Sequence, residues 1–114
     1  DVTGAMTLVL VPHNSPVIIP AGGGSFSAFA ALTNLSTSEF IIDVRLNIIL
    51  PDETVYPLRP PWVDVSLGPN AQYEIPNLHQ SVPGEVAAGE YQMEAEVLYQ
   101  GEVIHTAGFA VIKE

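Results

Sequence analysis

Short apolar stretches separated by proline and glycine are the feature that most limits what this chain can fold into. Ten prolines and nine glycines are spread through the 114 residues. Proline fixes its own φ and lacks an N–H donor, and glycine favours turns, so neither residue continues a long helix. Most of the stretches between them alternate apolar and polar side chains, which is the period of a β-strand. The sequence therefore predicts strands joined by turns.

Two long segments show this alternation most clearly. Residues 39–50 place apolar side chains on one face, while the other face carries Arg45. Residues 91–100 alternate in the same way and put Glu94 and Glu96 on their polar face. Because these two strands are commonly neighbours in a sandwich, we expect an ion pair between them.

The number and spacing of the strands predict a fold class. Seven to eight short strands without helices indicate two packed antiparallel sheets. We therefore expect one all-β domain over residues 1–114, an immunoglobulin-like antiparallel β-sandwich with Greek-key topology. Tyr91 follows residues 87–90 at the start of a long strand, which is the position of the tyrosine corner in such sandwiches.

Several phrases of the sequence resemble a group of Ig-like, fibronectin-III-like modules found in secreted bacterial proteins. The matching phrases cover most of the chain: VPHNSP at 11–16, IPAGGGSF at 19–26, LTN at 32–34, ILP at 49–51, VPG at 82–84 and AGEY at 88–91. The resemblance implies a β-sandwich and secretion, and it carries no catalytic motif. Such modules are often attached to extracellular enzymes or cell-surface proteins.

Charge and composition exclude several classes of partner. Thirteen acidic residues against three basic ones give a net charge of −10, which repels nucleic acid. No run approaches the roughly 18 apolar residues that a membrane-spanning helix needs. There is no cysteine, so neither a disulfide nor a thiolate site can form. The chain begins at Asp1, and we expect an extracellular, secreted protein whose signal peptide has been removed.

The sequence contains no recognisable catalytic or metal-binding constellation. Ser25 follows three glycines but lacks the G-x-S-x-G pattern of a nucleophile elbow. His13, His79 and His105 form no close pair at ligand spacing, so we expect no metal site. We therefore predict no cofactor and no enzymatic activity.

Calcium is the one cation that the acidic composition brings into consideration. Asp52 and Glu53 lie together in a turn, and Asp64 with Glu85 is a second pair of carboxylates. Hard cations need such clustered oxygens, but neither pair matches an EF-hand loop. We therefore do not expect specific calcium binding.

Two features could involve sugars. Tyr56, Trp62 and Tyr73 are candidates for an aromatic ligand platform, although Trp62 after two prolines is equally typical of a plug that closes the sandwich. Residues 34–36 match the N-glycosylation sequon in a predicted turn, a pattern that is frequent by chance.

Apolar side chains exceed what one sandwich of this size should bury. Hydrophobic residues make up 47% of the chain and charged residues only 14%. Period-two alternation sends many apolar side chains outward, where a neighbouring subunit would cover them unless β-bulges return them to the core. The candidate outer-face interface residues are Val9, Val11, Phe29, Ile41, Ile49, Leu98, Ile104 and Ile112.

The N-terminal residues suggest how such an association would form. Residues 1–11 precede a proline-broken hinge and are a candidate exchangeable strand, with Met6, Leu8 and Leu10 filling a neighbour's groove. The leading hypothesis is a non-enzymatic extracellular structural protein that self-associates into a homo-oligomer or polymer, such as a filament or surface layer. The alternative is a secreted accessory module that binds carbohydrate or protein.

Overall fold

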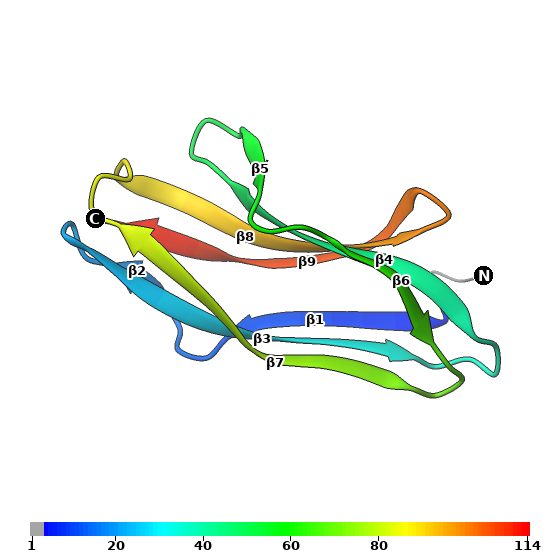
Figure 1. Ribbon diagram of the computed structural model, residues 1–114. Coiled ribbons are helices and arrows are strands. Elements are labelled where there is room, and N and C mark those ends of the chain that lie inside the picture. The colour runs from blue at the N-terminus through cyan, green and yellow to red at the C-terminus, as the bar shows by residue number, and fades with distance from the viewer. Residues whose placement is uncertain (1–3) are drawn as a thin grey trace.

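Residues 4–114 form nine strands arranged in two layers (Figure 1). The computed structural model describes residues 4–114, and no helix occurs in that range. Residues 1–3 of the proposed exchangeable strand lie outside the described residues. The strands are β1 (Met6–Pro12), β2 (Val17–Ile19), β3 (Gly23–Asn34), β4 (Phe40–Ile49), β5 (Val55–Pro57), β6 (Trp62–Leu67), β7 (Gln72–Pro83), β8 (Gly89–Tyr99) and β9 (Glu102–Lys113).

The two sheets differ in width. One sheet has three strands in the order β1-β3-β7, and the other has six, in the order β2-β9-β8-β4-β5 with β6 also paired to β4. The chain passes from one sheet to the other after β1, β2, β3, β6 and β7. The predicted all-β, immunoglobulin-like sandwich is therefore confirmed. The count of nine exceeds the expected seven to eight because β2 and β5 are separate strands of three residues each.

One strand pair departs from the expected antiparallel arrangement. β2 runs parallel to β9, whereas every other pair in the described residues is antiparallel. Pro12 and Pro16 interrupt the first strand, since proline cannot donate to a strand ladder. The chain then leaves the three-stranded sheet and joins the edge of the other sheet.

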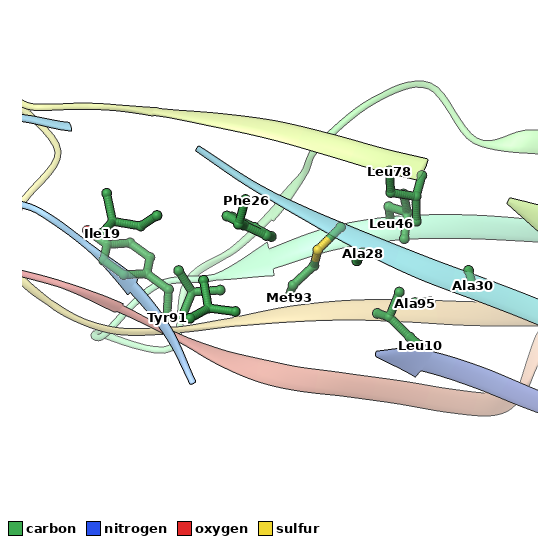
Figure 2. Close-up of a cluster of buried hydrophobic side chains, with 12 residues drawn as sticks. Leu10, Ile19, Phe26, Ala28, Ala30, Leu46, Leu78, Tyr91, Met93 and Ala95 are labelled. Atoms are coloured by element: carbon green, nitrogen blue, oxygen red, sulfur yellow. The ribbon is translucent and has the colours of Figure 1, made fainter. Parts of the chain in front are cut away.

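The core lies between the sheets as two adjoining clusters of apolar side chains. In the first cluster, Phe26 of β3 and Tyr91 and Met93 of β8 project into the space between the layers (Figure 2). Phe26 also meets Phe109 edge-to-face, with the ring centroids 5.9 Å apart. The second cluster is centred on six buried residues, Met6, Leu32, Ile42, Val44, Leu67 and Val97. Buried and less buried residues alternate strictly along β8, which explains why its inner face could be predicted from the sequence.

A β-bulge changes the placement of one predicted interface residue. Val97 pairs with His105 and Leu98 with Val103, so the ladder between β8 and β9 skips Ile104. Ile104 then packs against the second core cluster. For this residue, the alternative in which a bulge returns the side chain to the core is confirmed.

Tyr91 forms the expected tyrosine corner. Its hydroxyl donates a hydrogen bond to the Ala87 carbonyl at 2.8 Å, and the ring is buried in the first core cluster. The bond ties the connection between β7 and β8 to the start of β8. This motif was therefore predicted correctly from its position before a long strand.

Asn34 lies where β3 meets the turn in which the sequon was expected. It is the last residue of β3, and its side chain is completely buried. The Nδ2 atom, which would carry a sugar, instead donates to the carbonyls of Ser38, Leu67 and Gly68 at 2.7–3.0 Å. The expected turn is present at residues 35–39, but Asn34 belongs to the strand before it, and its amide serves as an internal hydrogen-bonding centre.

Candidate functional site: an unprotected sheet edge and an inter-sheet cavity

The edge strand β1 has unpaired backbone groups on the side away from β3. Proteins usually protect such edges with proline, charge, a bulge or a very short strand. Within residues 4–114, β7 carries Pro76 in its middle, β2 and β5 have three residues each, and β6 contains Asp64. β1 has seven residues, no charged side chain, and a proline only at its last position. Among the edge strands described, β1 is the one whose own sequence lacks these protections, and β9 of the other sheet lies close to it.

Outward-facing apolar side chains lie beside this edge. Val9 and Val11 are 43% and 46% exposed. Antiparallel pairing sets Val11 opposite Phe29 and Val9 opposite Ala31 on β3. Three of the predicted interface residues, Val9, Val11 and Phe29, therefore gather on the outer face of the three-stranded sheet. We call them the β1 patch.

The alternate side chains of β1 serve the chain's own core. Met6 and Leu10 are almost fully buried, and Leu8 packs against both core clusters. In this structure they fill the sandwich to which they belong. Exchange of β1 between copies would have to reproduce the same burial in a neighbour.

The remaining predicted interface residues lie on the six-stranded sheet. Ile41 and Leu98 line a groove of about 460 Å³ together with Asp43 and Asp64. Ile49 and Ile112 are half-buried on β4 and β9. These four residues do not join the β1 patch, which is on the other sheet.

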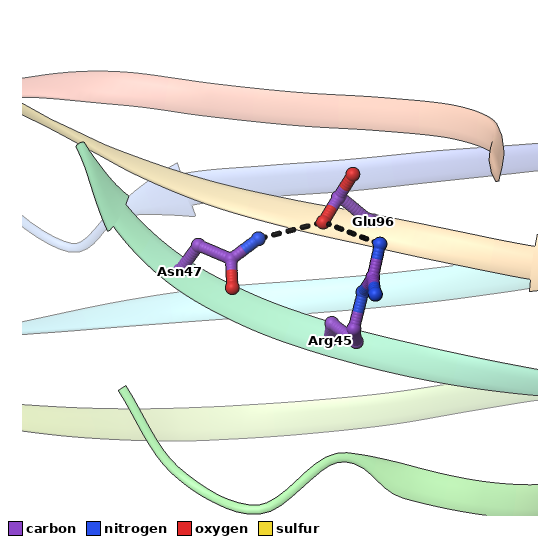
Figure 3. Close-up of polar contacts among 3 residues, drawn as sticks. All are labelled: Arg45, Asn47 and Glu96. Carbon is purple, nitrogen blue, oxygen red and sulfur yellow. Dashed lines mark hydrogen bonds and ion pairs between the residues drawn. The ribbon is translucent and has the colours of Figure 1, made fainter. Parts of the chain in front are cut away.

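The expected ion pair lies between the two long strands on the six-stranded sheet. Arg45 of β4 is in register with Glu96 of β8, and its Nη2 lies 3.2 Å from the Glu96 Oε1. Asn47 Nδ2 donates to the same carboxylate oxygen at 2.6 Å (Figure 3). The predicted pairing of these strands and of their charges is therefore confirmed.

The three aromatic residues of the predicted ligand platform have different surroundings. Trp62 and Tyr73 line one narrow gap of about 10 Å³ inside the sandwich and pack against the core. Tyr56 of β5 is 53% exposed and does not line that gap. The structure thus brings two of the rings together inside the protein, where Trp62 contacts both core clusters as a plug would.

Of the residues considered for calcium, Asp52 uses its carboxylate and Asp64 its backbone N–H in hydrogen bonds within the chain. Asp52 Oδ1 accepts the Thr54 N–H at 3.0 Å, and bonds from the Thr54 hydroxyl and N–H hold the pKa of the Asp52 carboxyl below its usual value. Asp64 donates its backbone N–H to Asp43 at 2.9 Å. No group of three or more metal-ligating side chains forms within residues 4–114.

Sequence reasoning missed a cavity between the sheets. It measures about 450 Å³ and lies between the C-terminal half of β7 and strands β4, β8 and β9. Its walls are mostly apolar and include Phe26, Ile48, Leu58, Val82, Val86 and Val111, with Lys113 as the one charged residue. We call it the inter-sheet cavity. The available signal was Lys113 itself, because the inward alternation of Phe109 and Val111 places a lysine where an apolar residue is expected.

The described residues contain no helix with the length and apolarity to cross a membrane.

No protein-family model matches the chain, and a search of curated proteins found no match either. Solved structures do resemble it. One is the CARDB domain of the PF1109 protein from Pyrococcus furiosus, solved in complex with di-metal ions: TM-score 0.63, 21% identity, covering 96% of this chain and 87% of that one.

Two further structures share the fold at lower identity. A Niemann-Pick type C2 protein from the Japanese carpenter ant has a TM-score of 0.60 and 13% identity, covering 95% of this chain and 89% of that one. The alkylpurine DNA glycosylase AlkC of Pseudomonas fluorescens, solved bound to DNA with an abasic site analog, has a TM-score of 0.58 and 18% identity. The match covers 95% of this chain but 30% of the glycosylase. At these identities the likeness establishes the fold alone: this chain is an immunoglobulin-like β-sandwich.

Proposed function

We propose that this chain is a non-enzymatic extracellular module that associates with a second copy of itself by pairing their β1 strands. The observation that carries the proposal is the unprotected edge of β1, a seven-residue uncharged strand flanked by the β1 patch. Free backbone groups on an edge supply the hydrogen bonds, and apolar side chains beside it supply burial.

A two-fold axis perpendicular to the sheet is the simplest geometry for this pairing. Two antiparallel β1 strands would join the two three-stranded sheets into one continuous sheet of six strands. The β1 patches of both copies would then lie next to each other on the same face. Such an interface is self-complementary, as dimers of identical subunits require.

A filament or surface layer needs a further step. Pairing at one edge closes after two copies, so a polymer requires a head-to-tail contact. Exchange of β1 would provide it: each copy would donate β1 to the next, with residues 13–16 as the hinge. Met6 and Leu10 would then occupy in the neighbour the positions that they occupy here in their own core.

Charge sets the conditions under which the pair forms. Each copy carries a net charge of −10, so two copies repel each other at low ionic strength. Salt screens this repulsion, with a Debye length of about 10 Å at 0.1 M. Association should therefore strengthen from low to moderate salt, which is opposite to the behaviour of an interface held by ion pairs.

The test measures molecular mass against protein concentration by sedimentation equilibrium. The double variant Val9→Lys/Val11→Lys places charges beside the edge and should remain monomeric where the unmodified chain dimerises. Val103→Lys is the matched control, because Val103 has the same 43% exposure as Val9 but lies on β9. A monomeric unmodified chain at millimolar concentration in moderate salt would refute the proposal, as would equal dimerisation by the double variant.

A further inference from the structure

The inter-sheet cavity lies on the side of the sandwich where the two sheets stay apart. On one side the edge strand β1 lies close to β9 of the other sheet. On the opposite side β7 is the edge of the three-stranded sheet, and the cavity occupies the space between it and strands β4, β8 and β9. The cavity is half open to solvent, and its volume of about 450 Å³ falls within the range of roughly 300–1,000 Å³ that ligand pockets occupy. A small molecule can therefore enter from this side.

The walls of the cavity are suited to hydrocarbon. Phe26 comes from the three-stranded sheet, and Ile48 and Val111 come from the six-stranded sheet, so apolar side chains line the cavity from both layers. Val82 and Val86 add apolar surface near the connection between β7 and β8. Water in such a space finds few hydrogen-bond partners, and its displacement by an apolar group gains binding free energy. The walls therefore favour a ligand whose body is hydrocarbon.

The one charged group of the wall is already satisfied within the chain. Lys113 is only 4% exposed. Its Nζ donates to the backbone oxygens of Ala21, Gly84 and Glu114 at 3.1, 3.3 and 2.8 Å, which uses its three N–H groups. In the 114-residue chain the Glu114 oxygen belongs to a carboxylate, which also balances the charge of the lysine. An arriving anion would therefore gain no free donor at Lys113.

The other polar side chains of the wall are bonded internally or lie toward solvent. The Tyr91 hydroxyl donates to the Ala87 carbonyl. The Gln80 Nε2 donates to the Ser81 carbonyl at 2.9 Å, and this bond is exposed. Gln80 therefore marks the solvent side of the cavity, where a hydroxyl group of a ligand can remain hydrated.

A ligand charge of either sign is unfavourable in this cavity. An anion would enter a protein whose net charge is −10, and a cation would lie beside Lys113. Either ion would lose hydration on entry without gaining a partner in the apolar wall. An uncharged ligand has neither cost.

We propose that the inter-sheet cavity binds an uncharged small molecule with a hydrocarbon body and at most one group of the hydroxyl type. The hydrocarbon lies against the walls that include Phe26, Val82 and Val111, and a hydroxyl stays at the open side near Gln80. Lys113 keeps its three contacts. This site is separate from β1, and its occupation does not depend on pairing between copies.

The test compares three probes of equal chain length that differ only in the head group. Decanol, decanoate and decyltrimethylammonium are titrated into the intact chain by calorimetry, each below its own aggregation or solubility limit. We expect one decanol per chain, bound at least about tenfold more tightly than either charged probe, because a charged group loses hydration in the cavity. Absence of saturable decanol binding would refute the proposal. Equal or tighter binding of a charged probe would refute the uncharged class of ligand.

A cavity-filling variant with a matched control locates the probe. Val86→Trp places a large side chain in the cavity and should abolish decanol binding. Val63→Trp makes the same change on β6, at a residue that is 61% exposed, and should bind decanol as the unmodified chain does. Decanol binding that survives Val86→Trp in a folded variant would overturn the assigned site.

Methyl NMR of the unmodified chain locates the probe even if Val86→Trp does not fold. Decanol should shift the methyl signals of Val82, Val86 and Val111, which line the cavity. The signals of Val63 and Val103, which are 61% and 43% exposed, should not move. Shifts confined to exposed methyl groups would indicate adventitious association with the surface and would overturn the proposal.

The β1 double variant separates this site from the proposed self-association. Val9→Lys/Val11→Lys should remain monomeric and should still bind decanol with unchanged affinity. Loss of decanol binding in that variant would place the probe at the β1 patch and overturn the assignment to the inter-sheet cavity. Binding in the cavity is thus tested independently of pairing through β1.

Discussion

Asn34 joins the end of β3 and the turn that follows it to the end of β6, which is more than thirty positions away. Its amide donates to carbonyls of the turn after β3 and of the end of β6, and its Oδ1 accepts the Ser36 N–H at 2.9 Å. Because the residue is fully buried, water cannot replace these bonds if the amide is lost. Asn34 is therefore a structural centre of the fold at the end where β3 and β6 finish.

Replacing Asn34 with alanine should destabilise the protein strongly. The change leaves buried carbonyls without donors, and we expect a loss of about 2–4 kcal/mol in the free energy of unfolding. Urea denaturation measures this directly. Asn77→Ala is the control, since Asn77 is exposed and should shift stability by no more than about 0.5 kcal/mol. Similar losses in the two variants would contradict the role assigned to Asn34.

The tyrosine corner allows a smaller and cleaner test. Tyr91→Phe keeps the buried ring and removes only the hydroxyl that donates to Ala87. We expect a loss of about 1 kcal/mol in the free energy of unfolding. Tyr56→Phe, at an exposed tyrosine, should leave the thermal midpoint unchanged. An unchanged midpoint for Tyr91→Phe would mean that the corner does not stabilise the fold.

These two residues mark what sequence could and could not predict at this scale. Tyr91 was recognisable because the corner is a local pattern: small residues, then a tyrosine, then a long alternating strand. Asn34 was read only as part of a sequon, since two of its hydrogen-bond acceptors, Leu67 and Gly68, lie more than thirty positions away. Its burial depends on how β3 and β6 approach each other.

At the scale of the strands, the contribution of the side-chain contacts between β4 and β8 to stability can be tested directly. Arg45 is 44% exposed and Glu96 15%, so solvent screens the ion pair. Exposed ion pairs contribute at most about 1 kcal/mol. Glu96 also accepts a bond from Asn47, which is itself buried. Loss of Glu96 therefore leaves a buried amide without its partner.

A double-mutant cycle separates these contributions. We expect Glu96→Ala to cost more than Arg45→Ala, and the coupling energy between the two to be below about 1 kcal/mol and to fall with added salt. Chemical denaturation by urea at two salt concentrations provides the measurement. A larger loss of stability for Arg45→Ala than for Glu96→Ala would contradict this account. It would mean that the ion pair contributes more to stability than the contact between Glu96 and Asn47.

Strand patterning predicted the long elements well and the irregular ones poorly. β4 and β8 were found because one face of each is buried and the other is polar, so alternation is visible. The skipped position at Ile104 was not located, because a bulge leaves no mark in the apolar pattern itself. The change of sheet between β1 and β2 was likewise invisible, although the prolines indicated a break.

At the scale of the whole molecule, the β1 patch and the inter-sheet cavity both depend on how the two sheets pack against each other. Apolar composition predicted surplus surface, and part of it is the β1 patch. The inter-sheet cavity could not be predicted, since it depends on the separation between β7 and strands from the wider sheet. Only the inward position of Lys113 hinted at it.

Amide hydrogen exchange on β1 tests the central proposal most directly. Amides of β1 that face β3 are bonded within one copy and should be protected at all concentrations. Amides on the other side of the strand should exchange rapidly in dilute solution and become protected as the concentration rises, because the second copy's β1 then accepts them. If the outward amides of β1 stay unprotected while the protein associates, or if no association occurs, pairing through β1 is contradicted.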